Sequence, residues 1–260
     1  MDKLEQLQAL LKSYSKVAIA YSGGCDSHFL YSVAVETLGK ENVLAFLCVG
    51  SMMSKEDINE AKHFLIDGFY EIVDVDVFDV PAFLHNHKDR CYHCKKMIMS
   101  HVIEKAQLYH IDFVLDGKNK DDESCYRPGM KACEELGILS PLAQVGLTKQ
   151  MIRDYSQQLH LPTHNKPSNA CLASRFPYDT FLTLEKLEMV SQAEAFLHQK
   201  GIKHVRVRVH GKLARIEVDR EQFIKIINDN ELILQFEKLG FQFITLDLKG
   251  ITSGSYDRLK

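Results

Sequence analysis

The stretch Val17-Ala-Ile-Ala-Tyr-Ser-Gly-Gly-Cys-Asp-Ser27 decides the fold class of this 260-residue chain. Residues 17–21 form a short apolar run, which is typical of a strand buried on both faces of a sheet. Residues 22–27 form a glycine-containing loop, and residues 28–38 are predicted to continue as a helix that Gly39 ends. A buried strand that passes through such a loop into a helix is the opening unit of an α/β domain.

The same order of elements continues through the first two thirds of the chain. Helical patterns lie at 4–14, 55–67, 95–109 and 149–160, and apolar runs that predict buried strands lie at 42–49, 70–77 and 112–116. This alternation predicts an α/β fold with a doubly wound parallel sheet and helices on both faces. Ligands of such sheets bind at the carboxyl ends of the strands, which is where the loop at 22–27 lies.

The pattern changes after about residue 178. A long amphipathic helix is predicted over 184–200, and residues 204–210 alternate strictly between apolar and polar, as a half-buried strand does. A hairpin partner at 213–218, helices at 220–227 and 231–239 and a strand at 242–248 complete this part. We therefore predict two domains, a doubly wound domain over 1–178 and a second, smaller α+β domain over 179–260.

Composition excludes several classes of protein. Hydrophobic residues make up 45% of the chain and charged residues 26%, which is ordinary for a globular protein. The net charge of −3 counts against a broad nucleic-acid surface, and no apolar run approaches the length of a membrane span. Seven cysteines are too few, and odd in number, for a disulfide framework, so we expect thiols in a reducing, cytoplasmic compartment.

The loop has the chemistry of a phosphate site. Gly23 and Gly24 allow the backbone to approach a ligand, and the free N–H groups at the start of the following helix favour an anion. Ser22 and Ser27 add hydroxyl donors, and the Asp26 carboxylate can hold Mg²⁺ against phosphates. The loop matches neither G-x-x-x-x-G-K-[ST] nor G-x-G-x-x-G. The plainer interpretation is a serine- and glycine-containing turn without a ligand.

The spacing of the cysteines leaves three interpretations open. Cys91 and Cys94 form a C-x-x-C pair just before a predicted helix, and Cys171 is remote in sequence. The pair could bind zinc together with His93 and Cys171, or it could form a redox disulfide. Alternatively, the three thiolates could hold a [4Fe–4S] cluster in which one iron has no protein ligand.

Four segments together resemble one family. The string Ser-Gly-Gly-Cys-Asp-Ser at 22–27 resembles the pyrophosphate-loop enzymes, which use ATP and release AMP and pyrophosphate. With the segments 116–129, 170–178 and 205–209, the chain closely resembles the LarE family of sulfur transferases over nearly its whole length. That family adenylates carboxylates of a pyridinium biscarboxylate mononucleotide and replaces oxygen by sulfur, in the synthesis of a nickel-pincer nucleotide cofactor.

The resemblance also implies roles for individual residues. Glu123 and Arg175 are expected to line the pocket, and Arg206 and Arg208 to hold a phosphate of the substrate. In an alternating strand the last two share one face, which suits a phosphate, although a solvated strand face is the plainer interpretation. Residues 116–117 end a predicted strand and can contact the pyrophosphate side of ATP, or simply form a turn.

The cysteines bear on the source of sulfur. Some LarE proteins sacrifice one cysteine, which becomes dehydroalanine, and in those proteins the positions of Cys91 and Cys94 are not cysteines. This chain departs from that pattern and is similar to the subgroup in which three cysteines carry a [4Fe–4S] cluster that delivers sulfide. Cys91, Cys94 and Cys171 are then the cluster ligands, and sacrifice of Cys171 is the alternative.

The resemblance implies a small-molecule nucleotide as substrate, no nucleic acid or membrane partner, and a homo-oligomer built through the second domain. Three rival functions stay open at this point. A tRNA-thiolating enzyme would need a basic face for RNA, an amide ligase would not need three cysteines, and a nucleotide-binding module would bind ATP without cleaving it.

Overall fold

The computed structural model describes residues 1–65, 67–124, 128–167 and 170–252. The chain divides into two compact units. The first comprises Met1–Gly50, Asp57–Val80 and Asp89–Asn169, and the second comprises Ser51–Glu56, Pro81–Lys88 and Ala170–Lys260. The domain boundary at 178 and the roles assigned to the two domains remain predictions.

The first unit is built on a four-stranded sheet, in which all three neighbouring pairs are parallel. Its strands are β1 (Val17–Tyr21), β2 (Val43–Val49), β3 (Tyr70–Asp74) and β4 (Phe113–Leu115), in the order β3-β2-β1-β4. In this register Tyr21 lies beside Leu47, and Ile19 lies between Ala45 and Leu115. The prediction of an α/β fold with a parallel sheet is confirmed.

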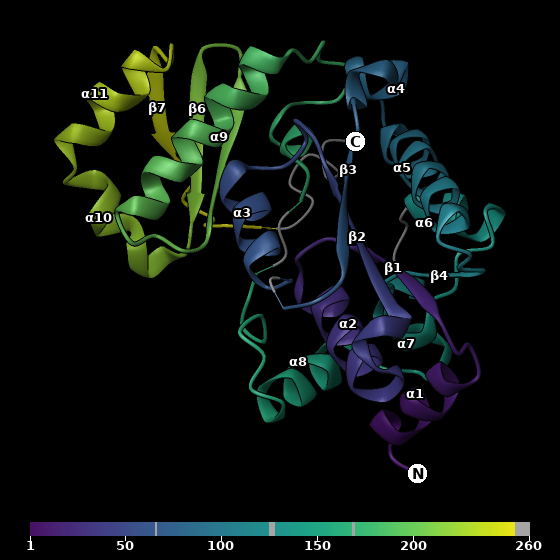
Figure 1. Cartoon of the computed structure of the whole chain (residues 1–260). Helices are drawn as coiled ribbons and strands as arrows, with labels where there is room; N and C mark the ends of the chain where they lie inside the picture. The colour runs from purple at the N-terminus through teal and green to yellow at the C-terminus, as the bar shows by residue number, and fades with distance from the viewer. Residues whose placement is uncertain (66, 125–127, 168–169, 253–260) are drawn as a thin grey trace. The chain divides into compact units, whose positions relative to one another are not determined.

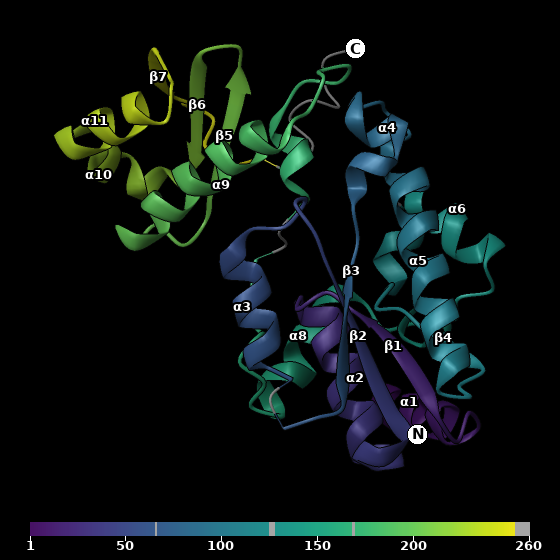
Figure 2. The ribbon, with the colours of Figure 1, turned by 45° about the horizontal axis from the view of Figure 1, so that its top comes forward.

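Helices cover both faces of this sheet. Figures 1 and 2 show α2 (Cys25–Leu38) and α3 (Lys55–His63) on one side, and α5 (Arg90–Leu108) and α6 (Pro128–Glu135) on the other. The remaining helices of the unit are α1 (Lys3–Lys12), α7 (Pro141–Gln144) and α8 (Lys149–Gln158), with 3-10 turns η1 (Lys40–Asn42), η2 (Val77–Asp79) and η3 (Lys120–Ser124). This two-sided cover explains why the strands are apolar runs rather than alternating ones.

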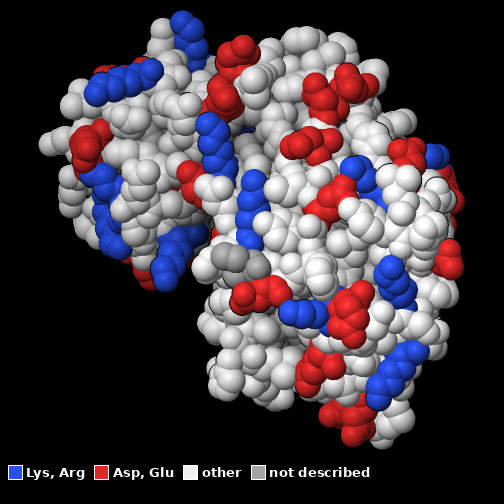
Figure 3. Space-filling model, in the orientation of Figure 1, with Lys and Arg blue, Asp and Glu red and all other residues white. Residues whose placement is uncertain are grey.

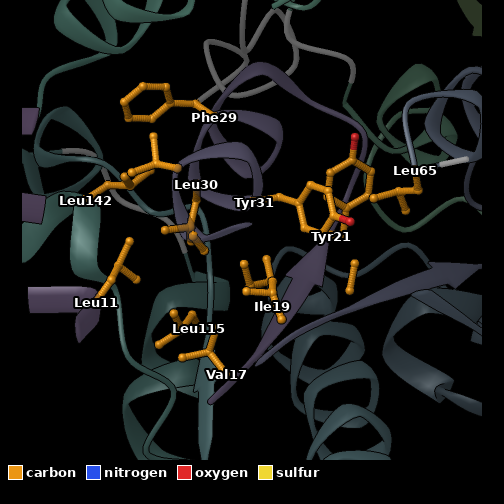
Figure 4. Close-up of a cluster of buried hydrophobic side chains, with 14 of the residues drawn as sticks. Leu11, Val17, Ile19, Tyr21, Phe29, Leu30, Tyr31, Leu65, Leu115 and Leu142 are labelled. Atoms are coloured by element: carbon orange, nitrogen blue, oxygen red, sulfur yellow. The ribbon is translucent and has the colours of Figure 1, made fainter. Parts of the chain in front are cut away.

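The core of the unit lies around β1 and α2. Val17 and Ile19 are fully buried, as are Phe29 and Leu30 of α2, and Leu11 of α1 packs into the same cluster (Figure 4). Burying each such side chain stabilises the fold by roughly 1.5–3 kcal/mol. The loop that follows β1 is therefore carried by one of the most deeply buried strands of the unit.

The strand order places the predicted loop at a switch point of the sheet. The chain leaves β1 toward β2 on one side, whereas β4 pairs with β1 on the other side. In open parallel sheets, ligands bind at such a position, outside the carboxyl ends of the strands. Ser22 follows β1 there, and Asp116 follows β4.

The second unit contains a three-stranded sheet of order β5-β6-β7. The strands β5 (Val205–His210) and β6 (Leu213–Val218) form the predicted antiparallel hairpin, and β7 (Phe243–Leu246) runs parallel to β6. Its helices are α4 (Pro81–Leu84), α9 (Leu184–Gln199), α10 (Phe223–Ile227) and α11 (Asn230–Lys238), with 3-10 turns η4 (Leu172–Arg175) and η5 (Arg220–Gln222). The described residues contain no helix long and apolar enough to cross a membrane.

Two predicted helix starts are wrong in ways that affect the site. Helix α2 begins at Cys25 rather than at residue 28, because Gly24 adopts the extended conformation of an N-cap. Helix α5 begins at Arg90, so the C-x-x-C pair lies inside its first turns rather than before it. In neither case is the side chain of the preceding residue hydrogen-bonded as a cap: Gly24 before α2 has no side chain, and Asp89 before α5 is a residue type that often caps but does not do so here.

Candidate functional site

The loop after β1 is held in shape by its own hydroxyl groups. The Ser27 Oγ donates to the carbonyl oxygen of Gly24 at 3.2 Å and lies 3.0 Å from the Ser22 Oγ. The backbone N–H of Ser22 donates to the same Ser27 Oγ at 3.3 Å. Ser27 is buried, whereas Ser22 is exposed. The two serines that sequence analysis treated as phosphate donors therefore also close the loop on itself.

The start of α2 offers backbone donors to an anion. The first N–H groups of a helix have no acceptor within the helix. Gly24, the N-cap residue of α2, has no side chain that could accept from them instead. Gly23 has a φ of +71°, which favours glycine, and a Cβ at this position would lie 2.6 Å from the Cβ of Ala61. The loop can thus take this path only with glycine at position 23.

The Asp26 carboxylate lies in the first turn of α2, and only one of its two oxygens accepts a hydrogen bond from the described residues. Its Oδ2 accepts a hydrogen bond from the Lys149 Nζ at 2.7 Å. Its Oδ1 is buried and contacts no hydrogen-bond donor within the described chain. A buried carboxylate oxygen without a partner is costly, and a hard cation such as Mg²⁺ satisfies it. Asp26 therefore fits the predicted magnesium ligand.

Residues after β4 approach the same loop. A Cβ on Gly117 would lie 2.9 Å from the backbone nitrogen of Ser27, so only glycine fits against the start of α2 there. The Asp116 Oδ1 accepts from the Ser140 Oγ at 2.7 Å and from the backbone N–H of Lys118 at 3.1 Å. The structure thus brings together the loop and the 116–117 turn, two segments that sequence analysis selected separately.

A buried aromatic pair lies next to this loop. The Tyr21 hydroxyl lies 2.8 Å from the His28 Nδ1, and the ring of His28 packs edge-on against Phe64. Burial, and to a smaller extent the positive charge of Lys166, together lower the pKa of His28 to about 4. His28 is therefore neutral at physiological pH, and it joins the end of β1 to α2.

Glu123 lies on the 3-10 turn η3 and is partly exposed. Its Oε2 accepts from the Lys120 Nζ at 2.6 Å, and this hydrogen bond lowers the pKa of Glu123. The neighbouring Asp121 accepts from the backbone N–H of Lys149 at 2.8 Å, which joins the acidic turn to the start of α8. The expected role of Glu123 in a substrate pocket remains a prediction.

The three selected cysteines are thiols. Cys91 and Cys94 belong to the first unit, and Cys171 belongs to the second. Cys91 and Cys94 are three residues apart in the first turns of α5, so they lie on one side of the helix. Cys91 is exposed and Cys94 is half-buried. Cys171 belongs to the second unit, where it precedes the turn η4. Among the described residues no group of three or more histidine, cysteine or acidic side chains could hold a metal ion.

Arg175 is buried in the second unit and pairs with a carboxylate that the sequence analysis did not select. Its Nε and Nη2 donate to the two carboxylate oxygens of Glu194 at 2.8 and 2.9 Å. Its Nη1 donates to the carbonyl oxygen of Ala170 at 2.9 Å. Such bidentate pairing fixes the plane of the guanidinium. Glu194 also accepts from the backbone N–H of Val207, which fastens α9 to β5.

The two arginines of β5 differ in their surroundings. Arg208 is 3% exposed, and it donates to the Glu217 Oε2 at 3.1 Å and to the carbonyl oxygen of Ser174 at 2.6 Å. Arg206 donates to the carbonyl oxygen of Thr252 at 3.1 Å. Burial lowers the pKa of Arg206, as do the positive charges of Arg175 and Arg208. Three guanidiniums therefore gather beside η4, and none of the carboxylate contacts found in the described chain involves Arg206.

Three charged residues of these sites were not predicted from the sequence, namely Lys149, Glu194 and Glu217. Lys149 follows the predicted N-cap Thr148, whose Oγ1 does accept from the backbone N–H of Met151 at 3.3 Å. The position of the helix was therefore predictable. The contact between Lys149 and Asp26 was not, because 123 residues separate them in the sequence. The two glutamates lie on an amphipathic helix and on a strand, where a charged residue usually faces water.

Comparisons with known proteins agree with this architecture. Residues 4–109 match the family model described as NAD synthase. A protein of uncharacterised function from Synechocystis sp. is 38% identical over 263 residues, which cover 99% of this chain and 98% of that protein. The pyridinium-3,5-bisthiocarboxylic acid mononucleotide synthase of Lactiplantibacillus plantarum is 34% identical, over 97% of this chain and 92% of that enzyme. A protein from Methanocaldococcus jannaschii is 31% identical over 96% of this chain.

Proposed function

Because the chain belongs to the LarE family of the pyrophosphate-loop superfamily, we propose that it adenylates a carboxylate of a pyridinium biscarboxylate mononucleotide and then inserts sulfur. The chain is an ATP-dependent enzyme of the synthase or transferase class. The observation that carries the proposal is the Asp26 carboxylate in the first turn of α2, which has one buried oxygen without a hydrogen-bond partner among the described residues. Such a site suits a magnesium-bound pyrophosphate.

The proposed first step is an adenylation. The loop residues 22–27 and the turn at 116–117 bind the phosphates of ATP, and Asp26 holds Mg²⁺ against them. A substrate carboxylate oxygen attacks the α-phosphorus, and the bond to the β-phosphate breaks with release of pyrophosphate. Lys149, which lies 2.7 Å from Asp26, supplies a second positive charge at the same place. The acyl adenylate carries AMP as a leaving group, whereas a free carboxylate has none.

The proposed substrate-phosphate site is the arginine cluster of the second unit. Arg175, Arg206 and Arg208 carry three positive charges, and Glu194 and Glu217 carry two negative charges among them. The remaining positive charge favours the arrival of an anion there, and the pKa of Arg206 is lowered by burial and by the neighbouring charges of Arg175 and Arg208. Glu123 and Arg175 are proposed to line the substrate pocket, as membership of the family implies.

We propose that Cys91, Cys94 and Cys171 hold a [4Fe–4S] cluster. The pair fits two of the ligand positions, because thiolates three residues apart on a helix share one side. The cluster would supply sulfide to the activated carbonyl, and AMP would leave with its oxygen. Loss of sulfur from Cys171 itself is the second candidate, which the half-buried position of that thiol also permits.

The function is tested by pyrophosphate release. With ATP, Mg²⁺, a sulfur source and the pyridinium biscarboxylate mononucleotide, we expect pyrophosphate and a product in which sulfur replaces oxygen in a carboxylate. The matched reactions contain tRNA, or a carboxylate with ammonia. Thiolated tRNA, an amide product, or ATP binding without any pyrophosphate would each contradict the proposal. On the face drawn in Figure 3, acidic and basic side chains are interspersed, which does not favour an RNA-binding face there.

The sulfur source is tested by anaerobic purification with analysis of iron and acid-labile sulfide. We expect about four irons per chain, and loss of the cluster in Cys91→Ser with Cys94→Ser. The matched control is Cys48→Ser, which changes a thiol of β2 outside the proposed set. Stoichiometric zinc would contradict the cluster. A loss of mass corresponding to H₂S at Cys171 after one turnover would favour the sacrificial route.

A homo-oligomer built through residues 179–260 and a cytoplasmic location are further parts of the proposal. Both follow from membership of the family rather than from the described residues. Sedimentation of the purified protein tests the first. A monomer at micromolar concentration would contradict it.

A further inference from the structure

A half-buried lysine, Lys166, lies behind the loop at 22–27 and has no role in the function proposed above. The Lys166 Nζ donates to the carbonyl oxygen of Gly23 at 3.1 Å. It also lies 2.5 Å from the Glu60 Oε2 and 3.7 Å from the Asp57 Oδ1, both on α3. The side chain is only 12% exposed. A buried ammonium is costly unless several acceptors surround it, and here a carbonyl and two carboxylates do so.

The main chain that carries Lys166 is itself fastened in place. The Arg153 guanidinium, on α8, donates to the carbonyl oxygens of His164 at 2.7 Å and of Lys166 at 3.0 Å. The loop is equally constrained on its other side, since Gly23 has a φ of +71° and lies against Ala61 of α3. The ammonium therefore joins two rigid segments that are 143 residues apart in sequence.

This contact determines where a phosphate donor points. The carbonyl of Gly23 and the N–H of Gly24 belong to the same planar trans peptide, so they point in opposite directions. Because the carbonyl is directed at Lys166, the N–H of Gly24 is directed away from it, toward the Ser22 Oγ at 3.4 Å. A cation on the carbonyl also polarises the peptide and strengthens its N–H as a donor.

We propose that Lys166 is a positioning residue for the ATP reaction, which acts through the Gly23 carbonyl to hold the Gly24 N–H on the side of the loop where the Ser22 hydroxyl lies, the side proposed to receive the pyrophosphate. This inference rests on the proposed use of ATP by the loop. A second consequence concerns charge. Without the ammonium, the carboxylate of Glu60, which lies 2.5 Å from it, would lose this positive charge behind a site that must accept a polyanion.

The test compares binding of inorganic pyrophosphate with Mg²⁺ and binding of adenosine, both by calorimetry, in the full chain. For Lys166→Met we expect pyrophosphate affinity to fall about 10- to 100-fold, as for the loss of a charged hydrogen bond, and adenosine affinity to change less than about twofold. Lys166→Arg, which keeps a cationic donor, is expected to restore pyrophosphate binding to within about threefold. An equal loss of both ligands would show a merely structural role.

The double variant Lys166→Met with Glu60→Gln removes the ammonium and a neighbouring negative charge together. It therefore separates the orientation of the Gly24 N–H from the effect of net charge, and it serves as the test should the single variant fold poorly. Persistent loss of pyrophosphate binding in it supports the proposal, whereas full recovery overturns it. The matched control is Lys200→Met, since Lys200 also pairs with two carboxylates, Asp229 and Glu231, but in the second unit. If the wild-type chain binds neither pyrophosphate nor Mg–ATP, the proposed use of ATP is wrong. If the wild-type chain binds both and Lys166→Met binds them equally well, only the proposed role of Lys166 is wrong.

Discussion

The loop after β1 and the arginine cluster beside η4 are both suited to phosphate, but they are built in different ways. The loop uses backbone N–H groups, two glycines and one carboxylate, all within residues 22–27. The cluster uses guanidiniums from η4 and β5 that are held by glutamates of α9 and β6. A site made of main chain depends on local geometry, whereas a site made of side chains depends on buried ion pairs between distant segments.

The difference predicts how each site fails. In the loop, an added methyl group obstructs a path that only glycine can take, while the rest of the unit is unaffected. In the cluster, removal of one charge leaves its partner buried and unpaired, so that the whole unit loses stability. Loop variants should therefore lose activity while folded, and cluster variants should unfold more easily.

The largest effect is expected for Glu194→Gln. The change leaves the Arg175 guanidinium, which is 3% exposed, without its carboxylate, and we expect the free energy of unfolding to fall by about 3–5 kcal/mol. Urea unfolding followed by circular dichroism measures it. The matched control is Glu231→Gln, an exposed carboxylate paired with Lys200, where stability is expected to be unchanged within error. Equal stability of the two variants would show that the arginine cluster does not depend on its buried ion pairs.

The next effect is expected for Gly23→Ala. The new Cβ would lie 2.6 Å from Ala61 at a φ of +71°, so we expect ATP-dependent pyrophosphate release to fall about 100-fold, because the loop must move off its path. Gly211→Ala is the matched control, since its φ is +63° but nothing lies within 4 Å of its Cβ position. It should lose about 1 kcal/mol of stability and no activity. An active Gly23→Ala enzyme would show that the loop is not a close-approach site.

The smallest effect is a dependence of stability on pH that arises behind the loop. The pKa of His28 is lowered to about 4 in the folded chain from an ordinary value of 6.5, chiefly by burial. The unfolded chain therefore binds the proton first as pH falls from 6.5 to 4, and the free energy of unfolding decreases over that interval, on the order of 2 kcal/mol. Urea unfolding at pH 7 and pH 4.5 measures it. His28→Gln should reduce this dependence, and an unchanged slope would show that His28 does not cause it.

Much of this molecule follows from local patterns. The buried strand at 17–21 coincides with β1, and the hairpin strand at 213–218 coincides with β6, because apolar runs and strict alternation are properties of consecutive residues. The short helices α4, α6 and α7 were missed. Helices α4 and α7 have four residues each, too few to show a helical period, and all three helices begin at proline. The start of α2 was misplaced because Gly24 has no capping side chain, whereas the start of α5 was misplaced although Asp89, a residue type that often caps, precedes it.

The sequence by itself determined the parallel α/β fold and membership of the LarE family, and it predicted that the loop with Asp26 binds phosphate. Only the tertiary structure decided which charges meet: Lys149 with Asp26, Lys166 with the Gly23 carbonyl, and Arg175 with Glu194. The physical reason is the range of the interactions. Backbone conformation and capping act over a few neighbouring residues, whereas an ion pair forms between whichever side chains the completed fold buries together.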